Sequence, residues 1–388
     1  MIFQLGFTYC WSNFSVPIEL ALQCTRRETS LIFSLQSVCY SLGNLLGGWL
    51  NQRTRLRRML LASAAAVSGG LLLTSLCSNL LFLFLSYGII WGLGSGVMNN
   101  TVLSNGSKWF PDKPGFANGT MLAFFGVGSF VLGLIISFGL DQVGWRFLFF
   151  TFGILFGCIS VTLSFLLNPP PSQADLANEN DSDLPTDRML RTRSFWFLFI
   201  WAALLMTGGM VALSNAAPIA LSMGTGTALA GFLTSFLALA NAFGRVGGGF
   251  LYDKLGYRRI LWITDVLFFS SCITMAAALY LNSVIFLVIT FLCMGITYGL
   301  TLMCSATFIR ERYGARHYSV NLSVILTTAI PSSLLGPGAA GMIRTQTGSY
   351  HGILILMVLL SILSFPFSHF LIRTKSDQHQ NPFGVKTL

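Results

Sequence analysis

The chain has 388 residues, of which 54% are hydrophobic and only 9% are charged. A soluble globular protein carries about a quarter charged residues, and the mean hydropathy here is +0.70, so the composition excludes a water-soluble enzyme. The net charge is +10, but the sequence shows no soluble domain on which basic residues could form a surface for nucleic acid. This argues against nucleic-acid binding. An outer-membrane barrel would show short alternating segments instead. The composition is therefore typical of a polytopic α-helical membrane protein.

Twelve apolar runs are long enough to cross a hydrocarbon core of about 30 Å as helices. They cover residues 2–22, 30–50, 59–78, 80–103, 115–139, 145–167, 194–218, 229–251, 258–280, 283–306, 318–343 and 350–372. The one long connection is rich in Pro, Asn and acidic residues and predicts a hydrophilic linker. We expect an amino-terminal six-helix half at 1–167, the linker at 168–193, a carboxy-terminal six-helix half at 194–373 and a tail at 374–388.

The basic residues predict how these helices are oriented. With both termini inside, 18 of the 23 Lys and Arg residues fall in cytoplasmic segments, four fall in outer loops, and Arg245 lies within a helix. This positive-inside bias predicts a multi-pass protein of the cell membrane with cytoplasmic termini.

No pattern in the sequence predicts a metal or a cofactor. The eight cysteines and four histidines lack the spacing of a metal site or a disulfide framework. The glycines of GRVGGG at 244–249 lie within a membrane helix, without the preceding strand that a nucleotide-binding loop requires. If this membrane protein moves a solute against its gradient, the energy would therefore come from an ion or substrate gradient and not from nucleotide hydrolysis.

The two halves of the sequence repeat each other. GNLLGGWLNQRTRLRR at 43–58 aligns without a gap on GRVGGGFLYDKLGYRR at 244–259. In the same way, Gly92 and Gly96 correspond to Gly295 and Gly299, and these glycines predict close helix contacts. Two parallel six-helix repeats joined by a polar linker resemble the architecture of the major facilitator superfamily.

The second-half loop reads GxxxDKxGxRR from Gly249 to Arg259 and resembles a signature of that superfamily. We interpret it as a latch, in which Asp253 pairs with arginines or with a helix N-terminus. The alternative is a charge cluster that only orients the helices. In the first half, Gln52 stands where Asp253 does and Arg55 replaces Gly256. The candidate latch residues are Gly48, Arg53, Gly249, Asp253, Lys254, Arg258 and Arg259.

Three stretches carry a more specific resemblance. SNGSKWFPDKPGFANG at 104–119, GFTYCWSNF at 6–14 and NAFGRVGGGFLYD at 241–253 are similar to the oxalate:formate antiporter family, a neighbour of the monocarboxylate transporters. The resemblance implies an aromatic-rich cavity in which two basic residues, in helices 8 and 11, bind a small carboxylate. The carboxylate would be exchanged for another anion or moved with a proton.

Arg245 matches the helix 8 arginine of that family. It lies eight residues before Asp253, or about 12 Å into the membrane at 1.5 Å per residue, near the depth expected of a substrate site. A guanidinium there is costly unless it faces water or an anion, and its planar fork suits a carboxylate. The alternative is a structural arginine that snorkels or pairs with Asp265. Its repeat partner, Asn44, is neutral but able to hydrogen-bond, and we expect it to contribute to substrate binding as well.

Helix 11 departs from the family pattern. TTAIPSSLLGPGAAG at 327–341 resembles the family's stretch, but Ile330 occupies the place of the lysine. A dianion such as oxalate would then bury an unpaired second carboxylate, so the sequence favours a monocarboxylate. Pro331, Gly336 and Pro337 are expected to kink or loosen this helix.

Other polar and aromatic side chains could line the path, although ordinary helix packing is the alternative for each. The candidates are Tyr9, Trp11, Asn118, Asn215 and Tyr298. Asp265 could carry a proton or neutralise Arg245, or it could pair with arginines of a loop. Glu19 is expected to form a surface pair with Arg26 or Arg27.

These observations predict an all-α secondary transporter that moves a small organic anion by alternating access, as an antiporter or an ion-coupled symporter. A monocarboxylate is the favoured cargo, and its partner would be a counter-anion or a proton. The alternatives are a dicarboxylate exchanger of the oxalate/formate type and an exporter of drugs or neutral solutes. We expect a monomer in the lipid bilayer, with no nucleic-acid partner.

Overall fold

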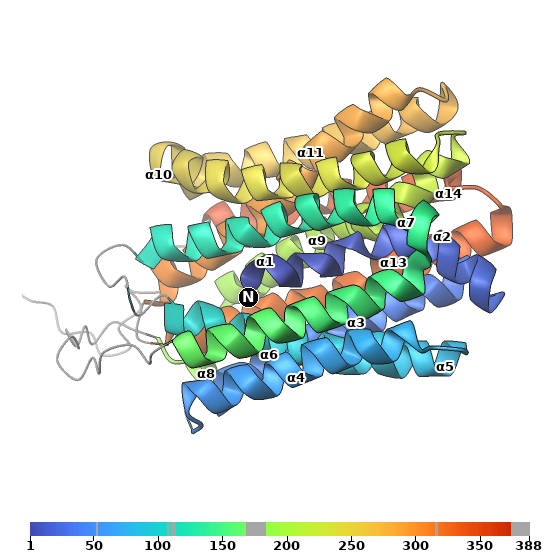
Figure 1. The fold of residues 1–388 in the computed structure, drawn as a ribbon. Coiled ribbons are helices and arrows are strands. Elements are labelled where there is room, and N and C mark those ends of the chain that lie inside the picture. Colours follow the sequence, from blue (N-terminus) through green and yellow to red (C-terminus); the bar gives the residue numbers. More distant parts are fainter. Residues whose placement is uncertain (52, 107–108, 110–113, 168–183, 315–316, 374–388) are drawn as a thin grey trace, which may run out of the picture.

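The computed structural model of the chain describes residues 1–51, 53–106, 109, 114–167, 184–314 and 317–373, and of residues 114–119, 253 and 319 the backbone alone. Its described elements are helices that run side by side along one axis (Figure 1). Nine helices in this part of the chain are long and apolar enough to cross a membrane. The remaining three predicted runs correspond to a broken helix at the start of the chain, to the continuous helix Arg26–Leu50, and to one of two runs that are joined in a single long helix.

The first half begins with a broken helix, because α1 (Ile2–Leu5) and α2 (Trp11–Leu22) are separated by the 3₁₀ segment η1 (Gly6–Cys10). Its other elements are α3 (Arg26–Leu50), α4 (Leu56–Ser75), α5 (Leu80–Leu83), the π-helical η2 (Phe84–Trp91), α6 (Gly92–Gly106) and α7 (Pro114–Leu166). Helix α7 holds two predicted runs, which turn at Gly144 with a φ of 76°. Glycine adopts such an angle readily because it has no Cβ.

The second half contains α8 (Thr186–Met189), α9 (Arg193–Ser222), α10 (Thr227–Tyr280), α11 (Val284–Tyr313), α12 (Tyr318–Ile325), the 3₁₀ segment η4 (Leu326–Thr328), α13 (Ala329–Thr347) and α14 (His351–Arg373). Helix α10 likewise joins two predicted runs, at Gly256 with a φ of 76°. Arg55, which replaces Gly256 in the first half, precedes α4 with a φ of −64°. Helix 11 contains the 3₁₀ segment η4 just before Pro331, whereas α13 is continuous through Pro331, Gly336 and Pro337, so the kink expected at these residues stays a prediction.

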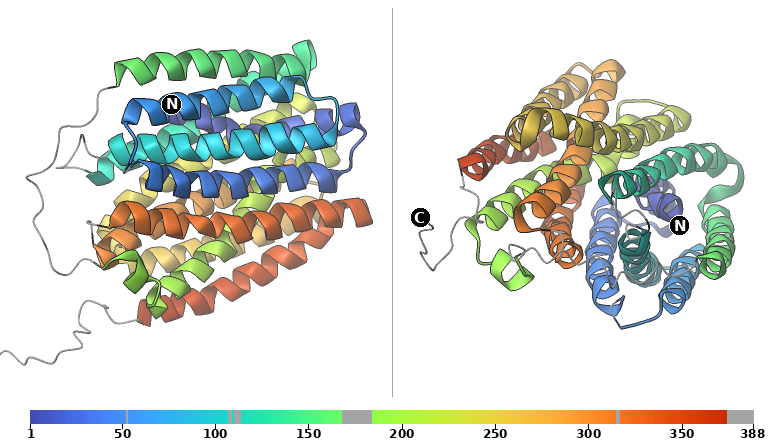
Figure 2. Two further views of the ribbon diagram at one scale, coloured as in Figure 1. Left: turned by 90° about the horizontal axis from the view of Figure 1, so that it is seen from below. Right: turned by 90° about the vertical axis from the view of Figure 1, so that its left-hand side faces the viewer.

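In the part of the chain that the structure describes, the twelve predicted runs therefore correspond to twelve helical segments in two six-helix repeats. Viewed along the bundle, the blue-to-green half lies beside the yellow-to-red half (Figure 2). The two halves meet along an interface to which α2, α3 and α7 contribute from the first half, and α9, α10 and α13 from the second. The predicted limits at residues 167 and 194 stay a proposal.

The repeat is visible in the helix contacts as well as in the sequence. A Cβ on Gly96 of α6 would lie 2.1 Å from the carbonyl oxygen of Tyr40 in α3. A Cβ on Gly299 of α11 would lie 2.3 Å from the carbonyl oxygen of Asn241 in α10. The glycines thus let each pair of helices touch at the backbone, as small residues do in membrane proteins. The predicted close contacts at Gly96 and Gly299 are confirmed.

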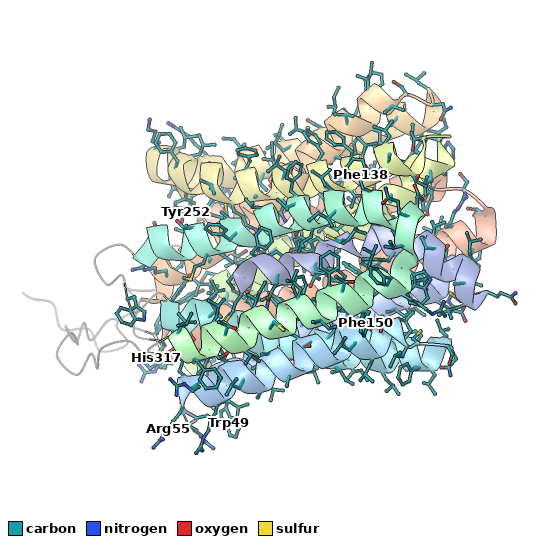
Figure 3. The ribbon with its side chains drawn as sticks, viewed as in Figure 1. Trp49, Arg55, Phe138, Phe150, Tyr252 and His317 are labelled. Carbon is teal, nitrogen blue, oxygen red and sulfur yellow. The ribbon has the colours of Figure 1, made fainter. Side chains whose placement is uncertain are left out.

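The two ends of the bundle differ in their residues. Trp49, Arg55 and His317 lie toward one end of the bundle, whereas Phe138 and Phe150 of α7 lie nearer the opposite end (Figure 3). Phe138 is 66% exposed, as expected of a side chain that faces lipid. We call the end with the turns after α3 and α11 the basic end. The opposite end, with the turns before α3 and after α9, is the far end.

Candidate functional site

Arg245 of α10 is buried at the interface of the two halves, with an exposed fraction of 6%. Its guanidinium donates three hydrogen bonds, to Asn241 Oδ1 at 3.2 Å, the Leu122 carbonyl oxygen at 3.3 Å and Tyr9 Oη at 3.3 Å. The ring of Phe125 lies 5.6 Å from its central carbon. All of these partners are neutral, and among the described residues no carboxylate lies within salt-bridge distance of Arg245. A buried positive charge is therefore left without a counter-charge, which is costly in a membrane protein.

Tyr9 reaches Arg245 from the opposite half, and it stands on the 3₁₀ segment η1. Its hydroxyl lies 3.4 Å from that of Tyr298 in α11, and its ring packs on Phe125 at 4.9 Å. The backbone of η1 lies against α7, since a Cβ on Gly6 would be 2.5 Å from the carbonyl oxygen of Phe125. Irregular backbone at this depth is tolerated where it is buried in protein or lines a site.

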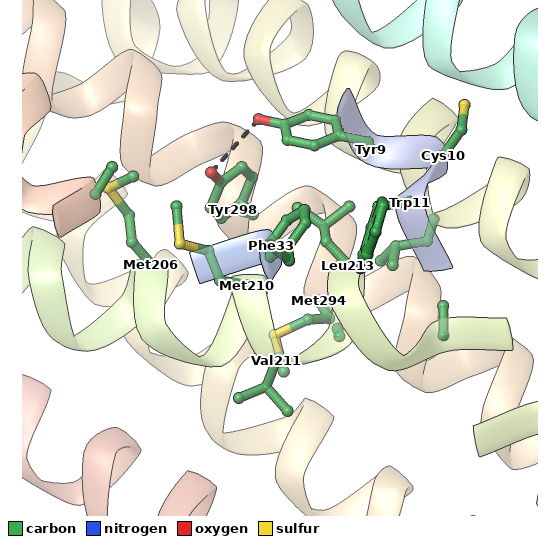
Figure 4. Close-up of a cluster of buried hydrophobic side chains, with 14 of the residues drawn as sticks. Tyr9, Cys10, Trp11, Phe33, Met206, Met210, Val211, Leu213, Met294 and Tyr298 are labelled. Atoms are coloured by element: carbon green, nitrogen blue, oxygen red, sulfur yellow. Dashed lines mark hydrogen bonds between the residues drawn. The ribbon is translucent and has the colours of Figure 1, made fainter. Parts of the chain in front are cut away.

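Tyr298 is accommodated by a glycine on a neighbouring helix. A Cβ on Gly209 of α9 would lie 2.3 Å from the ring of Tyr298, so no larger residue fits there without a shift. Figure 4 shows the two tyrosines hydrogen-bonded, with Met206, Met210 and Phe33 close to Tyr298. The group thus combines one cation and two phenols with an apolar wall.

Asn241 is a site residue that the sequence analysis missed. It is fully buried, and while its Oδ1 accepts from Arg245, its Nδ2 finds no hydrogen-bond partner among the described residues. An unpaired buried donor costs roughly 1–3 kcal/mol, so this amide has a hydrogen-bonding capacity that the described residues leave unused. The signal was its position four residues before Arg245, on the same face of the helix.

The other predicted path residues lie elsewhere in the bundle. Asn44 accepts from Asn99 at 2.8 Å and donates to its own helix. Trp11 stacks on Tyr87 with 4.5 Å between ring centres, within the first half. Asn215 accepts hydrogen bonds from Arg26. The side chain of Asn118 lies outside the described residues. Their roles in substrate binding stay predictions.

Asp265 is fully buried in the second half. Its Oδ1 accepts from Trp201 Nε1 at 2.9 Å, and the hydroxyls of Ser364 and Ser368 face the same carboxyl group. The described residues show no ion pair between Asp265 and Arg245 or a loop arginine, and the role of Asp265 in coupling stays a prediction.

The described latch residues lie at the basic end and contact aromatic rings. Arg53 stands over Trp49 at 4.2 Å, Lys254 over Phe250 at 4.2 Å, and Arg258 over Tyr257 at 5.9 Å. Arg259 is exposed. A Cβ on Gly48 would be 3.5 Å from Ser323 of the other half, whereas Gly249 has open space around it. The side chain of Asp253, Gln52, and most of the segment 104–119 lie outside the described residues, so the latch stays a prediction.

Glu19 and Arg26 form a bridge at the far end rather than the surface pair expected from the sequence. Their side chains are 2.9 Å apart and only 19% and 7% exposed. The predicted pairing of Glu19 with Arg26 is confirmed, but it is largely buried instead of lying on the surface, because Arg26 also bonds to the other half through Ser214 and Asn215. These contacts join residues almost two hundred positions apart, so no local sequence pattern predicts them.

The described residues hold no group of three or more His, Cys, Asp or Glu side chains that could bind a metal. Within a fold of two six-helix repeats, the structure brings a buried arginine of one half, Arg245, next to a phenol of the other half, Tyr9. The sequence profile of the Major Facilitator Superfamily matches residues 1–330. The chain belongs to this superfamily. It is thus a multi-pass membrane transporter and not an enzyme.

Curated relatives are similar over most of the chain. The uncharacterised MFS-type transporter YhjX of Escherichia coli is 27% identical, over 83% of this chain and 81% of its own length. The oxalate:formate antiporter of Oxalobacter formigenes is 25% identical, over 95% and 88%. Monocarboxylate transporter 12 of Rattus norvegicus is 24% identical, over 98% and 85%.

A solved structure supports the same fold. The D-xylose-proton symporter superposes with a TM-score of 0.75 at 14% sequence identity, over 97% of each chain. At this identity, the similarity concerns the architecture of the superfamily and not the cargo.

Proposed function

We propose that this transporter moves a small monocarboxylate by alternating access, with Arg245 as the residue that binds the carboxylate. The observation that carries the proposal is the buried guanidinium with three neutral hydrogen-bond partners. A carboxylate would supply the missing negative charge, and charge-assisted bonds to a guanidinium are the strong ones. We further propose that the basic end faces the cytoplasm.

The residues around Arg245 support a small cargo with an apolar part. Tyr9 and Tyr298 offer hydroxyl groups, and Asn241 offers an unpaired amide. Ligand sites of this kind combine an apolar lining with a few polar groups that set the orientation. Met206 and Met210, on the same side as Tyr298 in Figure 4, would contact the apolar part of the carboxylate.

The charge present supports a monoanion over a dianion. Arg245 is the cation of this group, and Ile330 stands in α13 where the family resemblance leads us to expect a lysine. A second carboxylate would be buried without a partner, at a cost of several kcal/mol. The oxalate:formate antiporter among the relatives keeps a dicarboxylate exchanger as the second candidate.

We propose exchange of one anion for another as the mode of transport. The immediate partners of Arg245 contain no carboxyl group, and Asp265, further along α10, accepts a hydrogen bond from Trp201 and forms no ion pair with Arg245 among the described residues. Exchange needs no titrating group at the site, because the returning anion neutralises Arg245 in turn. Asp265 as a proton carrier is the competing proposal.

A ligand screen on the purified protein tests the cargo. A ligand that binds only the folded state raises the melting temperature. We expect small monocarboxylates to raise it in the natural protein and to have no effect on Arg245→Gln, whereas Arg259→Gln, an exposed arginine, should respond normally. A response to dicarboxylates alone would favour the second candidate. A response that Arg245→Gln retains in full would refute the proposed site.

A further inference from the structure

Arg26, at the far end of α3, bonds to both halves of the transporter. Its Nη1 donates to Glu19 Oε1 at 2.9 Å, and its Nε and Nη2 donate to Asn215 Oδ1 at 3.2 and 2.9 Å. Nη2 also donates to the carbonyl oxygen of Ser214 at 2.6 Å. The residue is only 8% exposed. Its hydrogen-bonding capacity is therefore largely satisfied by the protein itself.

The start of α3 fixes Arg26 in this place. Thr25 and Glu28 form a capping box, in which the Thr25 backbone donates to Glu28 Oε2 at 2.7 Å. This box caps the N-terminus of α3, so the helix begins at Arg26. On the other side, a Cβ on Gly341 of α13 would lie 3.0 Å from the carbonyl oxygen of Arg26. The backbone of Arg26 thus touches the second half directly.

The bonds of Arg26 divide into two kinds. Glu19 belongs to α2 in its own half, so that ion pair is kept if the halves move apart. Ser214 and Asn215 belong to α9 in the other half, so those bonds break on any separation at this end. The arginine would keep a counter-charge throughout, which limits the cost of exposing it. It is therefore suited to a contact that forms and breaks repeatedly.

A pocket of about 260 Å³ lies directly against this contact at the far end. Its lining includes Glu19 and Arg26 from the first half, and Ser222, Arg344 and Tyr350 from the second. Since both halves line the pocket, the Arg26 contact forms part of its boundary. Separation of the two halves at this pocket requires that the contact between Arg26 and α9 break.

We propose that Arg26 is the gate residue of the far end, which closes the interface by bonding to Ser214 and Asn215 and opens it by releasing them while Glu19 is kept. The proposal does not depend on which solute is carried. It also assigns Asn215 to the gate, as the acceptor on the opposite half. Bonds to a charged donor are stronger than neutral ones, so their loss shifts the equilibrium toward the conformation open at the far end.

Hydrogen–deuterium exchange of the full-length protein measures this equilibrium at both ends. The variant is Arg26→Gln, and its matched control is Arg27→Gln, which removes the same charge from the neighbouring, exposed arginine. We expect backbone amides of the far ends of α3, α9 and α13 to exchange about tenfold faster in Arg26→Gln than in the control. Amides at the basic end should exchange more slowly, because opening one end closes the other.

A second variant removes the acceptor and leaves the ion pair. Asn215→Ala should change exchange in the same directions as Arg26→Gln, and the double variant should add little to either. The proposal is overturned if far-end amides of Arg26→Gln exchange at the control rate. It is equally overturned if both ends exchange faster in Asn215→Ala, since that is the pattern of general destabilisation.

Discussion

The guanidinium of Arg245 donates to the hydroxyl of Tyr9 at 3.3 Å, and this bond joins the carboxy-terminal half to the amino-terminal half. A cation and a phenol from opposite halves thus meet at the interface of the two repeats, where transporters of this kind bind their substrate. Neither group forms an ion pair among the described residues.

Replacing Tyr9 with Phe tests the contribution of its hydroxyl. The ring contact with Phe125 would remain, whereas the bonds to Arg245 and Tyr298 would be lost. A hydrogen bond contributes about 0.5–1.5 kcal/mol, so we expect the apparent affinity for the anion to fall about two- to tenfold. Concentration dependence of uptake into proteoliposomes measures it. Tyr87→Phe, which alters a buried phenol of the first half, should leave the affinity unchanged.

An acid in place of Asn241 should make transport depend on pH. Asn241 Oδ1 already accepts from Arg245, so the carboxylate of Asn241→Asp would pair with Arg245 and compete with the cargo. The competition is present when that carboxylate is charged and is relieved as it is protonated at lower pH. Uptake by the variant should therefore decrease with rising pH relative to the natural protein. Parallel pH profiles for the two proteins would contradict this account of the site.

The close glycine contacts predict which substitutions destabilise the fold. Alanine at Gly96 or Gly299 would place a Cβ 2.1 or 2.3 Å from a carbonyl oxygen, and such overpacking costs typically 1–3 kcal/mol. Alanine at Gly69 of α4 meets open space and serves as the control. Thermal unfolding should show a lower melting temperature for the first two variants alone. Equal melting temperatures for all three would refute the proposed packing.

A second cation should change the preferred cargo. Ile330→Lys would supply, in α13, the charge whose absence favours a monoanion, so a dicarboxylate would no longer bury an unpaired group. We expect dicarboxylates to gain relative to monocarboxylates in competition against a labelled substrate, and Ile330→Met, which adds no charge, to show no gain. Unchanged selectivity in Ile330→Lys would show that helix 11 does not contribute to the site.

The helices and the repeat could be predicted from the sequence because they depend on local properties. Apolar runs of sufficient length define the membrane helices, and paired glycines define where they touch. The start of α3 was placed four residues late, at residue 30 instead of Arg26, because polar residues occupy its first turn. The Thr25–Glu28 capping box, a recognisable pattern, would have located it.

The candidate site could be predicted only in part. Arg245, Tyr9 and Tyr298 were found, and the structure brings them together. The contact between Arg26 and Asn215 was missed, because it joins side chains that only the packing of the two halves brings close. The sequence places Asn215 among the candidates for substrate binding, which stays a prediction, since a buried amide in a membrane helix has no sequence pattern that distinguishes a gate from a binding site.

The most direct test of the account is counterflow of a labelled monocarboxylate in proteoliposomes that contain the natural protein, Arg245→Gln or Arg259→Gln. Arg245→Gln should bring counterflow down to the level of empty liposomes while its melting temperature without ligand stays near that of the natural protein. Arg259→Gln should retain counterflow, because that arginine is exposed at the basic end. Normal counterflow in Arg245→Gln would contradict the central claim, since the cargo would then cross without the buried cation.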